Sequence, residues 1–453
     1  MNFGENQSYT QYLQEKWSPV LEHQNLSPIK SNYKKAVLAQ LMENTATASE
    51  ISNMNVLTES APTNSIGAGT AISNYDPILI SLIRRALPNM MPFDLMGVQP
   101  MTGPTGIIFA MRSRYINQTG GEAFYNEADT VFSGAKGELQ NDSGNTLANG
   151  NSTATAGTLP NNTSTVLDDD KPGRAMPTSV AEQLGSDETH KFGQMAMTIE
   201  RITATAGSRA LAAEYSIEMA QDLKAIHGLD AEAELANMLS AEILAEINRE
   251  CIRTLYSVAS KGAQSGTTTA GIFDLDTDSN GRWSVERFKG LMFQIDRECN
   301  AIAKATRRGR GNVLLCSSDI ASALASTGLL DYNPAIKADL DVDDTGNPFV
   351  GTLKNGLKVY IDPYYGGVSN AQELMVVGYK GKDPKDAGVF YCPYVPLQKF
   401  VAWNPETFQP KIAYKTRYAM VANPFAHGLD KGNGALIADK NVYYRKVLVS
   451  NLM

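Results

Sequence analysis

A run of oxygen-bearing side chains that begins at Asp276 could hold a calcium ion. Asp276, Asp278 and Asn280 stand at positions 1, 3 and 5 of a hypothetical loop, the spacing at which a calcium loop places its first ligands. Such a loop needs a bidentate carboxylate at position 12, where this chain has Arg287, with Glu286 one residue too early. Because ordinary surface turns are also rich in Asp, Asn and Gly, we expect a polar turn. A calcium site at Asp276, Asp278, Asn280 and Glu286 is the less favoured alternative.

Residues that could perform catalysis are few and scattered. The chain has 4 histidines, none of them near a catalytic Ser, Cys or Asp motif: His23, His190, His227 and His427. The patterns GxSxG, HExxH and GxxxxGK followed by Ser or Thr are absent, so the usual marks of hydrolases, metalloproteases and nucleotide enzymes are missing. His227 precedes a glycine at a helix break, a position typical of a capping group. The sequence therefore predicts a protein that is not an enzyme and has no cofactor.

The cysteines and the one basic cluster also have ordinary interpretations. The 4 cysteines lack CxxC spacing and are interpreted as reduced packing residues: Cys251, Cys299, Cys316 and Cys392. Arg307, Arg308 and Arg310 follow a helical pattern, and the dipole of a helix favours cations at its C-terminal end. That role, or a salt bridge between subunits, is favoured over contact with nucleic acid.

Composition narrows the class of protein. The net charge of −8 argues against a chain that grips nucleic acid, since neutralising phosphates dominates that affinity. No apolar run approaches the roughly 20 residues that span a bilayer, and the polar start MNFGENQSYTQ lacks the core of a signal peptide. We therefore expect no membrane contact, and synthesis and use in a cytoplasm.

The N-terminal segment, residues 1–59, carries a single amphipathic helix pattern. Its apolar side consists of Tyr33, Val37, Leu38, Leu41 and Met42. A helix with such a stripe must bury it on a partner. Residues 60–74 are small and polar, as in a flexible arm.

Helix and strand signals alternate after this arm. Asp76-Pro77 fits a helix start, with an acceptor at the N-cap and proline at the first helical position. A stripe at three- and four-residue spacing then runs up to Pro88: Leu79, Leu82, Ile83 and Ala86. From Ile107 to Arg112 one strand leads out, and the alternation of Met195, Met197 and Ile199 predicts a second that leads back. The long excursion between them includes the low-complexity run 141–165, which cannot bury enough surface to offset its ordering entropy.

Helical spacing dominates residues 210–260, as one helix with a break or two in line. Leu211, Tyr215, Met219, Leu223 and Ile226 form a first stripe; after Asp230, which fits an N-cap, a second runs through Leu235, Leu239, Ile243, Ile247, Cys251 and Leu255. The acidic residues on the other faces are interpreted as a solvated side. From Phe288 onward helices alternate with short strands (312–316, 358–361 and 374–377), and 411–421 alternates as a half-buried strand with a basic face. An α+β architecture follows.

Several of these segments closely resemble one known family. They are YDPILISLIRRALPNMMPFDLMGVQPMTGPTGIIFAMRSRY (75–115), AAEYSIEMAQDLKAIHGLDAEAELANMLSAEILAEINRE (212–250), FKGLMFQIDRECNAIA (288–303), KVYIDPYY (358–365) and NPETFQPKIAYKTRYAMVANPFA (404–426). Together they cover most of the chain after residue 70, in colinear order. They resemble the major capsid protein of T-even-like contractile-tailed bacteriophages.

The resemblance implies a Hong Kong 97-type capsid fold. Its parts would be a scaffold-binding propeptide (1–59), the N-terminal arm and first helix (60–106), and an extended β-hairpin loop with the low-complexity insertion (107–200). A peripheral domain with a long spine helix (201–287), an axial domain (288–390) and return strands of the peripheral domain (391–453) would follow. Known members carry an inserted subdomain near the extended loop, whereas the low-complexity run dominates here, so a folded insertion is in doubt.

The resemblance also implies a function and partners. The chain would be a precursor that forms hexamers and builds an icosahedral head around double-stranded DNA without binding it specifically. The vertex protein, scaffold and core proteins, prohead protease and portal would be its partners, and the virion capsid, assembled in the host bacterial cytoplasm, its location. Leu57-Thr58-Glu59-Ser60 is similar to the site that the family's protease cuts: an aliphatic residue, then Glu before the cut and a small residue after it. A chance tetrapeptide in a linker is the alternative.

Other functions stay open at this point. The paralogous vertex protein would form pentamers from the same fold. A calcium-dependent surface-layer protein predicts an export signal, and an uncharacterised hydrolase predicts a clustered triad; the sequence lacks both features.

Overall fold

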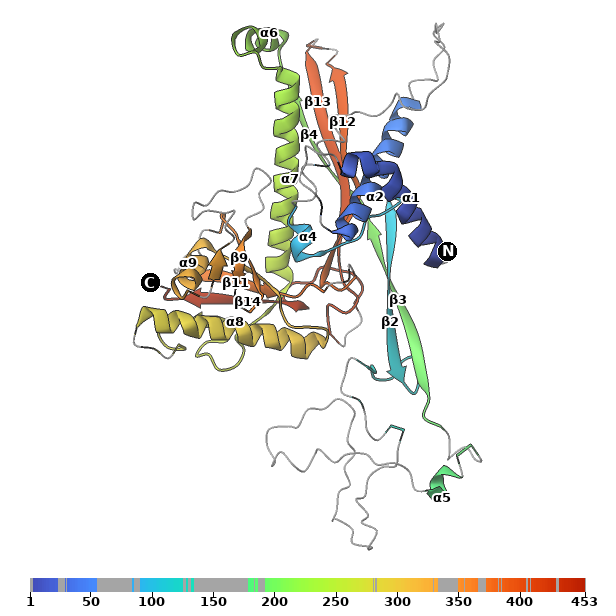
Figure 1. Cartoon of the computed structure of the whole chain (residues 1–453), viewed down its shortest axis with the longest axis vertical. Coiled ribbons are helices and arrows are strands. Elements are labelled where there is room, and N and C mark those ends of the chain that lie inside the picture. The colour runs from blue at the N-terminus through green and yellow to red at the C-terminus, as the bar shows by residue number, and fades with distance from the viewer. Residues whose placement is uncertain are drawn as a thin grey trace. The chain divides into compact units, whose positions relative to one another are not determined.

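The computed structural model describes residues 3–22, 29, 31–54, 84, 90–124, 128, 132–133, 178–182, 184–185, 192–279, 281, 283–328, 330–332, 349–353, 355–365, 372–381, 383, 385–404, 406–407, 409–428 and 432–452. The chain divides into two compact units. One combines Met1–Ile108 with Ile202–Met453, and the other is Phe109–Arg201. Helices and sheets are mixed along the chain (Figure 1), which confirms the expected α+β class.

The first sheet of the larger unit is built on a long hairpin. Its strand order is β1 (Gly97–Val98), β12 (Val389–Trp403), β13 (Pro410–Ala422) and β4 (Gly207–Glu214). β13 runs antiparallel to both neighbours. Within β13, Ile412, Tyr414 and Tyr418 are buried, whereas Lys411 is exposed. The alternating strand expected at 411–421 is therefore confirmed.

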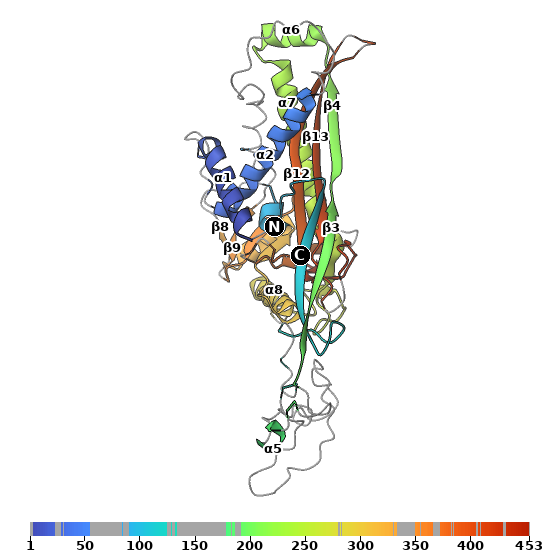
Figure 2. The ribbon, with the colours of Figure 1, turned by 90° about the vertical axis from the view of Figure 1, so that its right-hand side faces the viewer.

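The spine helix lies along this sheet. α7 (Ala231–Val258) begins at Asp230, whose side chain accepts a hydrogen bond from Glu232 N, and contacts β4 and β13. α6 (Ile217–Ile226) ends at His227, whose N–H donates to Leu223 O. Figure 2 shows that α6 lies across the end of α7, so the expectation of two helices in line is wrong. Gly228, at a φ of +68°, makes this turn.

One predicted part of the helical region is a strand. Leu211, expected in the first helical stripe, belongs to β4, where it pairs with Tyr414 of β13. The small residues of 207–214 fit either period. The neighbouring strand supplies the backbone partners that decide the conformation.

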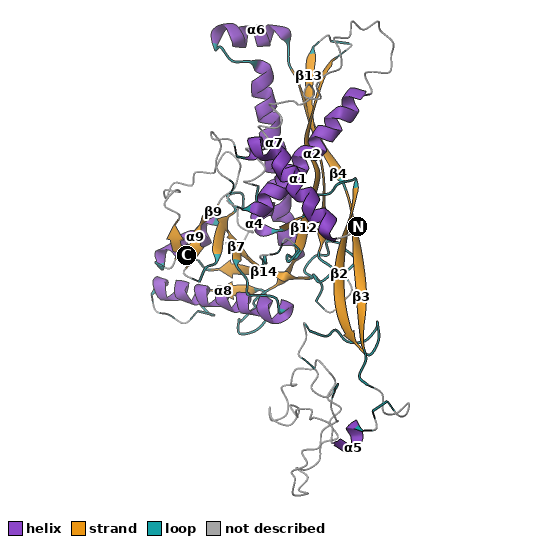
Figure 3. Cartoon of the chain, turned by 45° about the vertical axis from the view of Figure 1, so that its right-hand side comes forward, coloured by secondary structure: helices purple, strands orange, loops and turns teal. Residues whose placement is uncertain are grey.

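The second sheet forms the other half of the larger unit (Figure 3). Its strand order is β5 (Ala259–Lys261), β14 (Asn441–Ser450), β11 (Glu373–Gly378), β7 (Val313–Cys316), β10 (Lys358–Ile361), β9 (Phe349–Leu353) and β8 (Leu330–Tyr332), and β6 (Ile272–Asp274) also pairs with β14. α8 (Ser284–Thr306) contacts β11 and β14, and α9 (Ser318–Ser326) contacts β10 and β11. The strands expected at 312–316, 358–361 and 374–377 are confirmed. β14 lies in this sheet and not beside β12 and β13, although the resemblance places 391–453 in one group of return strands.

The smaller unit carries a two-stranded ribbon. β2 (Thr105–Tyr115) leads into it and β3 (Met195–Thr205) leads out, and the two strands pair. The predicted excursion is therefore confirmed at both ends. Beyond a short helix, α5 (Thr178–Ala181), most of the excursion, including 141–165, lies outside the described residues.

The N-terminal segment differs from the expectation of one helix. It forms two, α1 (Phe3–Leu21) and α2 (Asn32–Met54), which contact each other. A short helix, α4 (Pro92–Leu95), precedes β1. The expected arm 60–74 lies outside the described residues, as does the helix expected at 76–88 except for Arg84, which is helical.

Candidate functional site

The histidines and cysteines of the described residues are not gathered into a metal site. Within these residues, no group of three or more His, Cys, Asp or Glu side chains could hold a metal ion. His227 ends α6, and His427 lies in the turn after β13. All four cysteines are free and buried, and burial raises the pKa of each thiol. They are therefore packing residues, as expected.

The acidic residues after β6 form hydrogen bonds and an ion pair with neighbouring residues. The Asp276 carboxylate pairs with the Arg287 guanidinium. One oxygen of Asp278 accepts from the N–H and hydroxyl of Thr268, each at 2.7 Å, and the other accepts from Asp274 N at 3.0 Å. Burial raises the pKa of Asp278, but these hydrogen bonds outweigh it and the pKa lies below its usual value. The two carboxylates thus face different partners and stabilise the turn.

Other predicted site residues are not brought together. The Glu286 carboxylate accepts from Trp283 N at the start of α8. Asn280 and the three cleavage-site residues, Leu57, Glu59 and Ser60, lie outside the described residues. The calcium alternative and the cleavage site stay predictions.

The basic cluster is used within the chain. Arg308 lies 3.3 Å from Asp386 and over the ring of Phe425, and Arg310 lies 2.5 Å from Asp296. Arg307 is the C-cap of α8 in the left-handed conformation, with a φ of 51°. The cluster therefore ends α8, as the helix interpretation expected.

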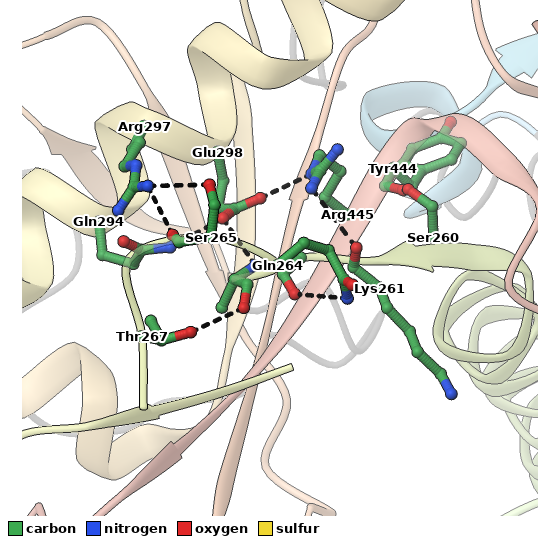
Figure 4. Close-up of polar contacts among 12 residues, drawn as sticks. Ser260, Lys261, Gln264, Ser265, Thr267, Gln294, Arg297, Glu298, Tyr444 and Arg445 are labelled. Atoms are coloured by element: carbon green, nitrogen blue, oxygen red, sulfur yellow. Dashed lines mark hydrogen bonds and ion pairs between the residues drawn. The ribbon is translucent and has the colours of Figure 1, made fainter. Parts of the chain in front are cut away.

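Glu298 joins α8 to the second sheet (Figure 4). It is only 4% exposed. Its carboxylate accepts from Ala263 N at 2.9 Å, from Gln294 Nε2 at 2.8 Å and from Arg445 Nε at 2.6 Å. A Cβ on Gly262 would lie 2.8 Å from the same carboxylate, so this approach requires glycine. These donors come from three segments, which makes Glu298 a structural joint.

A second joint links the spine helix to the same sheet. Asp362, at the end of β10 and 1% exposed, accepts from Arg249 Nη1 at 2.6 and 2.7 Å and from the Tyr256 hydroxyl at 2.9 Å. Both donors lie on α7. One signal could have indicated this contact: Asp362 directly follows the mainly apolar strand KVYI.

A third joint corrects the expectation of a fully solvated acidic side on α7. Arg209 of β4 pairs with Glu246 at 3.0 Å and with Glu250 at 2.6 Å. The Tyr418 hydroxyl of β13 donates to Glu250. Two of the acidic residues therefore fasten the spine helix to the first sheet, while Glu234 and Glu242 are exposed as expected.

The two-stranded ribbon has an apolar face that is open to solvent. In the smaller unit, side chains at alternate positions of β2 and β3 are between 52% and 62% exposed: Phe109, Met111, Met195, Met197 and Ile199. Contiguous apolar patches of this kind mark interaction sites in proteins that assemble. This face is the candidate functional site.

The other face of the ribbon carries a buried ionic cluster. Arg112, 1% exposed, lies 2.9 Å from Glu122 and 3.2 Å from Glu200. Arg114 lies 3.6 Å from Glu200 and donates to Thr198. The cluster ties the turn after β2 back onto both strands, which fixes the orientation of the apolar face.

The N-terminal helices bury their stripe inside the chain. Val37, Leu38, Leu41 and Met42 are buried, and α2 contacts β12. The partner that this stripe was expected to need is therefore part of the same chain. One part of that partner, β12, is more than 300 residues away in sequence, so helical spacing could not indicate it.

Comparisons with known proteins show the family of this chain. The family model of the major capsid protein Gp23 matches residues 72–449. The major capsid protein of Serratia phage KSP90 is 38% identical over 98% of both chains, and that of Enterobacteria phage T4 is 33% identical over 97% of this chain and 98% of its own. The solved capsid of Myoviridae phage XM1 aligns with a TM-score of 0.35 and 8% identity over 78% of this chain and 90% of its own.

The vertex protein of phage T4 matches less of the chain. It is 28% identical over 51% of this chain and 53% of its own length. Family model and full-length relatives both point to the major capsid protein instead. The chain belongs to the family of the major capsid protein Gp23, a structural protein of the phage virion capsid and not an enzyme.

Proposed function

We propose that this chain is the precursor of a shell subunit that forms hexamers and closes into an icosahedral head around double-stranded DNA. The Hong Kong 97-type fold is part of the proposal. The first sheet with α7 would be the peripheral domain, the second sheet with α8 and α9 the axial domain, and the β2–β3 ribbon the extended loop. The order of these elements along the chain supports it.

The observation that carries the proposal is the exposed apolar face of the ribbon. A two-stranded ribbon is marginally stable in water by itself. Burying Phe109 and Met197 on another copy would remove apolar surface from water at about 25 cal/mol per Å². Symmetric repetition of one such contact builds closed assemblies from identical subunits.

Charged substitutions on this face test the proposal. We expect a Phe109→Glu/Met197→Glu double variant to stay as unassembled subunits in sedimentation and negative-stain microscopy, because assembly would bury two unpaired charges. Met197→Leu keeps the apolar surface and should assemble as the unchanged chain does. Normal shells from the double variant would refute the assigned interface.

Maturation is the second part of the proposal. Cleavage by a prohead protease between Glu59 and Ser60 would remove the N-terminal segment, called the leader from here on. Since the leader's stripe is buried on the chain, scaffold and core proteins would bind its exposed side chains instead, such as Tyr9 and Tyr12. Portal and vertex protein would complete the shell. A net charge of −8 fits a wall that holds DNA without gripping it.

The vertex protein's half-length match makes a pentamer former the second candidate. Class averages of assembled capsomers distinguish the two. Six-fold averages support the hexamer, and five-fold averages alone would favour the vertex role.

A further inference from the structure

The leader is docked on a defined face of its own chain. Leu38, Leu41 and Met42 of α2 are completely buried. They share one hydrophobic core with Met91, which precedes α4, and with Val98 of β1, the strand that pairs with β12. Burial of this size is what anchors a helix to a surface. The leader therefore has a binding partner before any scaffold arrives.

One side chain of the leader holds two segments of the rest of the chain, called the body from here on. The amide nitrogen of Asn44 donates to Met101 O at 2.8 Å and to Tyr394 O at 2.9 Å. These two segments are themselves joined, because Met101 N donates to Pro393 O at 2.9 Å. Asn44 thus recognises the edge where the segment after β1 runs beside β12.

Charged contacts reinforce the docking at the other end of the leader. Lys34 lies 3.7 Å from Asp94 and over the ring of Phe93, both in α4. The Arg84 guanidinium, from the body, donates to Leu21 O at 3.0 Å. The contacts therefore run from Leu21, at the end of α1, to Asn44, in the middle of α2.

The two leader helices are also fastened to each other. Lys16 lies 2.8 Å from Glu43, and Trp17 Nε1 donates to the same carboxylate at 3.0 Å. Lys35 lies 2.8 Å from Glu22. These contacts join the two helices to each other.

The fit is incomplete on one side. A groove of about 370 Å³ separates leader from body there. Gln40 and Glu43 line it from the leader, and Tyr394 and Arg417 from the body.

We propose that the leader is a clasp: in the uncut chain α1 and α2 cover the face formed by residues 97–102 and 391–398, and after cleavage they leave together and uncover it. While the leader is attached, its effective concentration at the face is in the millimolar range. Cutting the chain ends this tether, so the two helices are then held only by the contacts described above. The timing of release rests on the proposed cleavage, whereas the clasp itself exists in the uncut chain.

Hydrogen exchange of the uncut chain with Asn44→Asp tests the clasp. Aspartate has the same shape, but its carboxylate cannot donate and would face two carbonyl oxygens. We expect exchange in residues 97–102, 391–395 and α2 to speed up by about tenfold or more. Amides of β11 and β14, in the second sheet, take no part in the Asn44 contacts and should exchange as in the unchanged chain. Unchanged protection at the covered face would overturn the proposal.

A matched control and a second variant complete the test. Gln11→Glu makes the same amide-to-acid change at an exposed position of α1 and should alter none of these rates. If Asn44→Asp also loosens β11 and β14, Lys34→Ala decides: faster exchange confined to 90–102 and α2 supports the clasp, and no change refutes it. Because no cut is involved, this result is independent of whether maturation cleavage occurs.

Discussion

Single buried carboxylates hold together segments that are far apart along this chain. Glu298 binds donors from 35 and 147 residues away, and Asp362 binds donors from 113 and 106 residues away. The types of these residues are visible in the sequence, but their partners are not. No local spacing relates groups that only the tertiary fold brings together.

Replacing Asp362 by Asn tests this view at one joint. The amide keeps the shape but loses the charge that binds Arg249 and Tyr256, and hydrogen bonds to charged groups contribute about 1.5–3 kcal/mol. We expect the free energy of unfolding of the subunit to fall by that amount in urea titrations. Asp383→Asn, at an exposed position, should change it by less than about 0.5 kcal/mol. Equal effects of the two variants would contradict a joint at Asp362.

The turn at Asp276 gives a second prediction at this scale. The Asp276 carboxylate is paired with Arg287, and the Asp278 carboxylate accepts hydrogen bonds from Thr268 and Asp274. Calcium would therefore have to displace existing partners. A ligand raises the melting temperature only if it prefers the native state. We therefore expect calcium and a chelator to give the same melting curve. A chelator-reversible rise that disappears in Asp276→Ala would establish the calcium site instead.

Among the elements, periodic patterns predicted the conformation and the buried side best where one face of the element is buried and the other is exposed. The four-residue spacing of Ile243, Ile247 and Cys251 gave the buried side of α7, and Asp230 gave its start. The same reasoning misplaced Leu211, because small residues suit both periods and a neighbouring strand decided between them. It recognised the leader's stripe but could not locate β12, since contacts across hundreds of residues leave no local signal.

The spine helix allows a graded test of that buried side. Ile243 is 0% exposed, whereas Leu239 is half-buried at the rim of the core. Ile243→Ala should cost about 2–5 kcal/mol in the free energy of unfolding, through lost burial and the cavity left behind. Leu239→Ala should cost clearly less, because water already reaches part of its side chain. Heads should then form from Leu239→Ala but not from Ile243→Ala. The reverse order would mean that the buried face is misassigned.

At the scale of the whole molecule, the net charge of the chain bears on the proposed shell. Residues 1–59 contain four Lys, six Glu and no Arg or Asp, so they carry a net charge of −2 and their loss changes the chain from −8 to −6. The subunit would stay acidic before and after the proposed cut. Under the proposed function, weak repulsion of phosphate by such a wall would let packaged DNA move. The sequence could indicate this balance but not the ribbon face or the clasp, because both depend on which surfaces the fold leaves open or covered.

Maturation cleavage is the last prediction, and it concerns the assembled particle. A protease enclosed in the immature head would cut the linker between Glu59 and Ser60 and would need the Glu59 carboxylate as a charge-specific contact that an amide cannot replace. Intact-mass analysis of mature particles should show chains that begin at Ser60, and Glu59→Gln should leave heads in the immature form. Glu50→Gln, the same change within α2, is the control and should mature normally. If particle chains instead retain the N-terminal residues, the cut lies elsewhere or does not occur, and the clasp would then be a permanent part of the shell.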